Sequence, residues 1–141
     1  MVRLLFIVLT LDLLTSSISY SAEDMDPAIK DVQELLRTQS KREEVIKNDS
    51  KAKQADDFAL QAVGGNQTLK NDVYDVSADI MATVQKLSEG DPAKMNALLQ
   101  KALQNPGEFL KSLPSDQQAK IRDIAAKTEA QKKSAPVAPK P

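Results

Sequence analysis

The sequence lacks three side chains that carry much of protein chemistry. Among its 141 residues there is no cysteine, no histidine and no tryptophan. Without cysteine, the chain can form neither a disulfide framework nor a thiolate metal centre, and it has no thiol nucleophile. Without histidine, it lacks the most frequent general base and the most frequent ligand of transition metals. We therefore expect a protein that is not an enzyme, with no metal site and no cofactor.

An excess of charge of one sign is also missing. Nineteen Lys and Arg residues face 20 Asp and Glu residues, so the formal net charge is −1, whereas nucleic-acid binders usually rely on a positive field. One candidate basic cluster consists of Lys41 and Arg42 with Lys47, Lys51 and Lys53. They alternate with Glu43, Glu44 and Asp49, which largely cancel the local field, and no aromatic platform for stacking bases accompanies them. We expect no nucleic-acid partner.

Residues 1–21 have the three-part layout of a secretory signal peptide: a basic start, an apolar run and a small, polar end. The apolar run from Leu4 to Leu14 is shorter than the roughly 20 residues that a membrane-spanning helix needs, and Asp12 interrupts it. Cleavage after Ser21 would leave Ala22 as the first mature residue, and retention as an uncleaved anchor is the alternative. This layout predicts an exported protein, periplasmic in a bacterium and otherwise secreted.

The clearest helix lies between residues 69 and 88. Apolar side chains and one threonine recur there at alternating steps of four and three residues, which predicts a heptad-like seam. The members of this seam are Leu69, Val73, Val76, Ile80, Thr83 and Leu87. Gly90 ends the helix, and Asp91-Pro92 has the N-cap and first-turn residues of the next one. The same start signal occurs at Asp26-Pro27.

The region 27–63 is poorer in large apolar residues. A seam of small residues runs through its second half and ends at Gly64-Gly65, a helix-stop signal. This seam consists of Ala52, Ala55, Ala59 and Ala62. The pair Glu43–Lys47, four residues apart, favours one long, bent helix across the region, and a break at Asn48-Asp49-Ser50 is the alternative.

Together, these patterns predict an all-α fold, a small bundle of four to five helices. A signal peptide (1–21) would precede a helical domain (22–133), in which 27–63 forms an arm and 66–133 the denser core. The proline-rich residues 134–141 are typical of a disordered tail.

Carboxylates are the remaining candidates for acid–base chemistry. Asp72, Asp75 and Asp79 lie on the predicted helix 69–88, and Asp75 and Asp79 are one turn apart. Paired carboxylates can act as general acid and base or bind a hard cation. These three alternate with the apolar seam, which favours a solvated face. A hydrolase that uses only carboxylates is the enzymatic alternative, and it requires two carboxyl groups that face each other across a cleft.

The two seams are the remaining candidates for function. They could form a helical hairpin around Gly64-Gly65, and such hairpins dock a further helix or dimerise; packing within the monomer is the alternative. We predict a non-enzymatic, exported protein-interaction module, an accessory or regulatory factor of a cell-envelope machine such as a pilus or secretion system. Its partner would be another protein, with a homodimer as a second option. The residues predicted to bind the partner are Ala52, Ala55, Phe58, Ala59, Ala62, Val73, Val76 and Ile80.

A membrane-surface or lipid-binding helical protein is the alternative function. It requires an exposed apolar stripe over residues 92–113, where the apolar spacing is that of an amphipathic helix.

Overall fold

The computed structural model describes residues 22–134, and within this range every regular element is a helix. The described elements are α2 (Ala22–Arg37), α3 (Gln39–Asn48), α4 (Ser50–Ala62), α5 (Gln67–Ser88), α6 (Pro92–Gln104), α7 (Pro106–Ser112) and α8 (Ser115–Ser134). The predicted all-α fold is confirmed. The predicted signal peptide and the tail after Ser134 lie outside the described residues.

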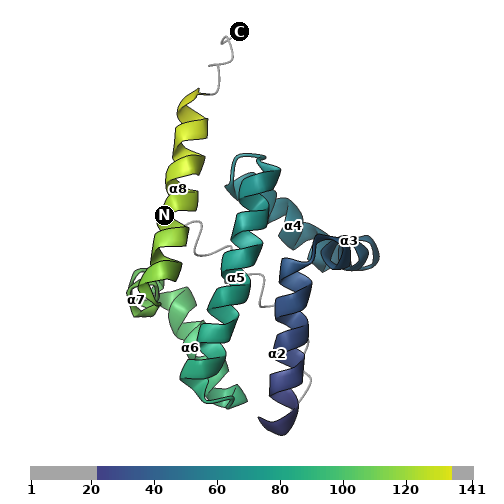
Figure 1. Ribbon diagram of the computed structural model, residues 1–141, viewed down its shortest axis with the longest axis vertical. Coiled ribbons are helices and arrows are strands. Elements are labelled where there is room, and N and C mark those ends of the chain that lie inside the picture. Colours follow the sequence, from purple (N-terminus) through teal and green to yellow (C-terminus); the bar gives the residue numbers. More distant parts are fainter. Residues whose placement is uncertain (1–21, 135–141) are drawn as a thin grey trace.

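Helix α5 is the centre of the bundle. Figure 1 shows α2 and α8 on either side of it, with α6 and α7 beside α8 and with α3 and α4 near the end where α5 begins. Every one of these helices except α3 contributes at least one residue to a single apolar core around α5. The residues that they supply include Ile29 from α2, Ala59 from α4, Met95 from α6, Phe109 from α7 and Ile121 from α8.

The buried stripe of α5 differs from the predicted heptad seam in its second half. Val73, Val76 and Ile80 are at most 2% exposed, as the seam predicts. Leu87, however, is 50% exposed, and Val84 and Ser88 are buried instead. A helix of 3.6 residues per turn drifts by about 20° per heptad against a strict 3.5 repeat. The later core positions of α5 therefore follow the helix period and not the heptad.

The region 27–63 contains two breaks between helices, whereas the sequence favours one long, bent helix across it. Thr38 and Asp49 are extended (φ −99° and −128°), and they separate α2, α3 and α4. Asp49 makes the second break stable because its side chain accepts from the backbone amides of Lys51 and Ala52 (2.7 and 3.2 Å), which caps α4. The predicted number of four to five helices is therefore wrong. Seven helices lie within residues 22–134, because of these two breaks and because the segment after α6 forms a separate short helix, α7.

The predicted helix ends differ in how closely the structure follows them. Gly64, Gly65 and Gly90 have positive φ angles after α4 and α5, as helix-stop glycines require. Asp91 caps α6 with Pro92 in its first turn, as predicted. The start at Asp26-Pro27 is wrong, since α2 begins at Ala22 and Pro27 lies inside it. The Asp-Pro pair alone therefore does not set the start of this helix.

Candidate functional site

The two carboxylates that suggested acid–base chemistry have different surroundings. Asp75 is exposed on α5. Asp79 is partly buried, and its two oxygens pair with Arg37 Nη2 of α2 and Lys120 Nζ of α8, both at 2.6 Å. Hydrogen bonding to Asp79 and its negative charge raise the pKa of Lys120. Asp79 thus joins three helices, and both of its oxygens are occupied by cations.

Gln117 extends this junction into the contact between α5 and α8. Its buried side chain donates from Nε2 to the backbone oxygen of Asp79 (3.1 Å) and to Thr83 Oγ1 (2.7 Å). Thr83 is the polar member of the predicted seam, and this bond gives its hydroxyl a partner inside the bundle. Gln117 Oε1 is the only buried side-chain oxygen or nitrogen without a hydrogen-bond partner among the described residues.

Arg42 of α3 is the only buried charged side chain in the described part of the chain, at 7% exposure. Its Nη1 donates to the backbone oxygen of Leu36, and its Nη2 donates to Asn71 Oδ1 at 2.7 Å. The guanidinium carbon lies 4.4 Å from the centre of the Tyr74 ring, within cation–π range. Because Leu36 is in the last turn of α2, Arg42 also places positive charge at the negative end of that helix.

Tyr74 connects Arg42 to a second set of charges. Its hydroxyl donates to Asp56 Oδ1 of α4 at 2.9 Å, and Asp56 Oδ2 pairs with Lys70 Nζ at 2.8 Å. The Asp56 and Lys70 side chains are 14% and 12% exposed, which makes them the least exposed ion pair of the described residues. Burial, and then the hydrogen bond to Asp56, hold the pKa of Tyr74 well above its ordinary value.

We call Arg42, Asp56, Lys70, Asn71 and Tyr74 the polar network. It joins α3, α4 and α5 to the end of α2. Both carboxylate oxygens of Asp56 are engaged, one by the Tyr74 hydroxyl and one by Lys70. The geometry therefore suits the fastening of helices better than proton transfer.

Sequence reasoning missed the role of Arg42. Arg42 lies in the run of alternating charges at 41–53, which predicts a solvated face, and Asn71 follows 29 residues later. Neighbouring basic residues do lie on the surface, where Lys41 pairs with Glu34 and Lys53 with Asp57. No local pattern in the sequence distinguishes Arg42 from them.

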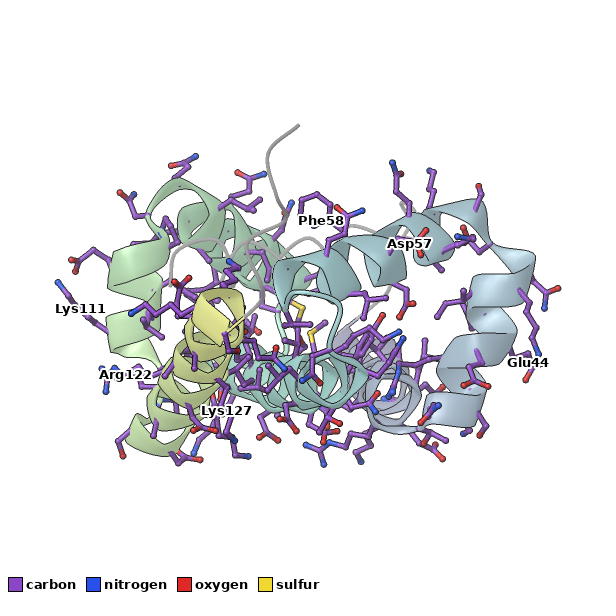
Figure 2. The ribbon with its side chains drawn as sticks, turned by 90° about the horizontal axis from the view of Figure 1, so that it is seen from above. Glu44, Asp57, Phe58, Lys111, Arg122 and Lys127 are labelled. Atoms are coloured by element: carbon purple, nitrogen blue, oxygen red, sulfur yellow. The ribbon has the colours of Figure 1, made fainter. Side chains whose placement is uncertain are left out.

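The eight residues predicted to bind a partner fall into three groups. Ala59, Val73, Val76 and Ile80 are at most 2% exposed and belong to the core, and Ala62 packs against it. Ala52 and Ala55 are half-buried on α4. Phe58 is 56% exposed, and Figure 2 shows it pointing away from the bundle on the outer side of α4. In this structure the second half of the small-residue seam and the first half of the α5 seam pack within the chain, and Phe58 is the large candidate presented at the surface.

Two further kinds of site are absent from the described residues. No helix within residues 22–134 has the length and apolar character needed to cross a membrane. The same part of the chain holds no group of three or more acidic side chains placed to bind a metal ion.

Fold and site thus define the class as an all-α bundle whose helices are joined by an apolar core and by polar contacts between helices. No family model, curated protein or solved structure matches the chain.

Proposed function

We propose that the protein is a non-enzymatic, exported interaction module that binds another protein by helix-on-helix contact. The observation that carries this proposal is the exposure of Phe58. Among the described residues, the exposed large apolar side chains are Val45, Phe58 and Leu87, and Phe58 is the most exposed of them. An aromatic ring in water is costly, and aromatic residues are the most frequent anchors of protein interfaces.

The residues around Phe58 suit the approach of a partner helix. On a helix, the side chains three and four positions away share one face. For Phe58 these are Gln54, Ala55, Gln61 and Ala62, which are small or uncharged. The result is an apolar centre with a polar, uncharged rim on α4. An amphipathic helix of a partner protein is the ligand whose shape and polarity match this face.

The cellular setting is the finer part of the proposal. The layout of residues 1–21 supports export, and the lack of histidine and cysteine supports a binding role over catalysis. We propose that the module serves a cell-envelope machine, such as a pilus or a secretion system, as an accessory or regulatory factor. The lipid-binding alternative requires an exposed apolar stripe over 92–113, but Met95, Phe109 and Leu113 are buried there, and nothing in the described residues favours it.

Site-specific photo-crosslinking tests the contact. A photoreactive phenylalanine analogue replaces Phe58 in one variant and Leu87 in a matched control, since both side chains are about half exposed. In cells of the source organism we expect a discrete adduct from position 58 only, and Phe58→Ser should abolish partner capture without changing the thermal melting of the protein. The absence of an adduct at position 58, or equal adducts at both positions, would contradict the proposed face.

Fractionation and intact mass test the export. The processed form is expected outside the cytoplasm, with Ala22 as its first residue. An unprocessed chain confined to the cytoplasm would refute the export part of the proposal and leave the Phe58 contact as a separate question.

A further inference from the structure

Helix α3 is attached to the bundle differently from the other helices. Arg42 is its only buried residue; Val45 is exposed and Ile46 is half-buried. Its main packing neighbours are α2 and α4, the helices that flank it in the sequence. Figure 1 shows it at the edge of the bundle, far from α6, α7 and α8, and Figure 2 places Glu44 at that outer edge. No residue of α3 belongs to either apolar cluster of the described structure.

A single residue separates α3 from the neighbouring helix at each of its ends. Thr38 has φ −99° and ψ 105°, and Asp49 has φ −128° and ψ 116°, so each junction is one extended residue between two helices. The Thr38 side chain makes no capping hydrogen bond to α3, and the first turn of α3 has no acidic residue. Helix α3 is therefore a separate segment of ten residues that lacks the usual support at its N-terminus.

The buried polar contacts that hold α3 against α2 and α5 converge on Arg42. Its guanidinium reaches the backbone oxygen of Leu36, Asn71 Oδ1 and the face of the Tyr74 ring. Charge-assisted hydrogen bonds of this kind are among the stronger ones in proteins. A helix of ten residues is marginal in water, because isolated helices need about 12–15 residues to persist. Arg42 thus makes the only buried attachment of α3 among the described residues, beside the exposed Lys41–Glu34 ion pair and the half-buried Ile46.

Helix α4 has its own attachment to α5. The Asp56–Lys70 ion pair and the Asp56–Tyr74 hydrogen bond join the two helices, and Ala59 is fully buried in the core. None of these contacts passes through α3. If α3 detached from α2 and α5, α4 would therefore remain docked on α5.

We propose that residues 39–48 form a strap that Arg42 holds closed, and that the strap opens and unfolds locally while the rest of the bundle stays folded. Opening breaks the bonds to Leu36 and Asn71 and uncovers the face of the Tyr74 ring that the guanidinium covers. The open state then exposes this face of the Tyr74 ring and frees the Arg42 guanidinium. This device is separate from the proposed contact of Phe58, which lies on α4.

Hydrogen exchange measured by mass spectrometry tests the strap in the unaltered protein. We expect the amides of 39–48 to exchange faster than those of α5, through an opening whose denaturant dependence is smaller than that of global unfolding. The proposal is overturned if these amides exchange at the same rate as those of α5 with the same denaturant dependence, since α3 would then open only when the whole bundle unfolds.

Two matched variants then test the role of Arg42. Arg42→Met keeps much of the side-chain stem but removes the charge and the hydrogen bonds, and we expect protection of 39–48 to fall by roughly tenfold or more while α5 and α8 keep theirs. Lys41→Met removes the same charge from the same helix at an exposed position, where Lys41 pairs with Glu34. It should change protection by less than about twofold. Unchanged protection of 39–48 in Arg42→Met, or collapse of the whole bundle, would overturn the proposal.

Discussion

At the scale of single residues, Val76 is one of the most deeply buried side chains of α5. It is 1% exposed and belongs to the apolar core. Val76→Asp would place a carboxylate among apolar groups with no designed partner, so we expect the free energy of unfolding to fall by more than about 3 kcal/mol. Urea unfolding followed by far-UV circular dichroism measures this change. The exposed neighbour offers a control: Asp75→Ala should stay within about 0.5 kcal/mol of the original protein, and equal stability of both variants would show that α5 is not the centre of the core.

Tyr74 predicts a specific response to alkaline pH. An ordinary tyrosine loses its proton near pH 10, but burial and the bond to Asp56 raise the pKa of Tyr74 in the folded state. Above about pH 10 the unfolded chain has released this proton while the folded chain retains it, so the free energy of unfolding falls as pH rises. Below that pH the contribution is fully present. Tyr74→Phe should cost about 1 kcal/mol at neutral pH, through the lost hydrogen bond, and should remove this part of the alkaline fall.

The difference in free energy of unfolding between the original protein and Tyr74→Phe reports on the tyrosine alone. The lysines, which also titrate at high pH, are the same in both proteins. Urea unfolding of the original protein and of Tyr74→Phe at about pH 8 and about pH 11 provides the four required values. We expect the stability gap between them to narrow or reverse at the higher pH. A gap of constant size would mean that the Tyr74 hydroxyl is as free to ionise in the folded chain as in the unfolded one.

Residue-scale features of the site divide by how far apart their partners lie in the sequence. The apolar spacing of α5 indicated the burial of Val73, Val76 and Ile80, because the helix period alone places them on one face. The burial of Arg42 and Gln117 depends on contacts with other helices, among them Asn71 for Arg42 and Thr83 for Gln117, which lie 29 and 34 residues away. When the positions of those helices are unknown, the polarity of both side chains predicts a place on the surface. Sequence reasoning therefore found the core and missed the polar contacts that join helices.

At the scale of elements, the end of α5 contains a position where a substitution should increase the stability of the protein. Glu89 has φ 55° and is the only residue other than glycine with positive φ among those described, while Gly90 follows with φ 73°. Left-handed backbone is unfavourable for residues with a Cβ atom. Glu89→Gly should therefore raise the free energy of unfolding by roughly 0.5–1 kcal/mol, since the exposed ion pair with Lys94 contributes little.

Gly90→Ala provides the opposite test at the adjacent position. No atom lies within 4 Å of a Cβ built on Gly90, so the backbone angle alone is tested. We expect a loss of roughly 1 kcal/mol, measured by the same thermal and urea unfolding as Glu89→Gly. A neutral Gly90→Ala would indicate that this turn adopts another conformation in solution.

Helix ends were predictable where a dedicated residue sets them. Gly90 and Asp91 define the junction of α5 and α6 through positive φ and an N-cap, which are local effects. The breaks at Thr38 and Asp49 were harder, because the local signals there conflict. Asp49 is well placed for a helical pair with Lys53, yet its side chain caps α4 instead. Two breaks allow both α2 and α4 to dock on α5, and the free energy of this docking favours the broken arrangement over one continuous helix. Such tertiary packing cannot be read from a short window of sequence.

At the scale of the whole molecule, the composition of 27–63 suggested an arm beside a denser core. The structure shows that this region supplies Ile29, Ala59 and Val63 to the main cluster around α5. Leu36 of α2 also covers Tyr74 and Ala78 of α5 in a second cluster. The buried apolar residues of this region thus come from α2, from α4 and from Val63 at the end of α4, whereas Val45 and Phe58 stay exposed. A region can be low in apolar content and still complete a core when some of its apolar side chains face the central helix.

This arrangement predicts the behaviour of a chain that begins at residue 66. Without α2 and α4, the chain keeps α5 to α8 but leaves Tyr74 and Ala78 without Leu36, and the rest of the core without Ile29, Ala59 and Val63. Because one contiguous apolar face of the central helix would meet water, we expect helical circular dichroism to persist while the thermal transition broadens and a hydrophobic dye binds. The chain 22–134 should melt in one sharp transition with little dye binding. A sharp transition without dye binding in the shorter chain would mean that 66–134 folds alone and that 27–63 is an arm after all.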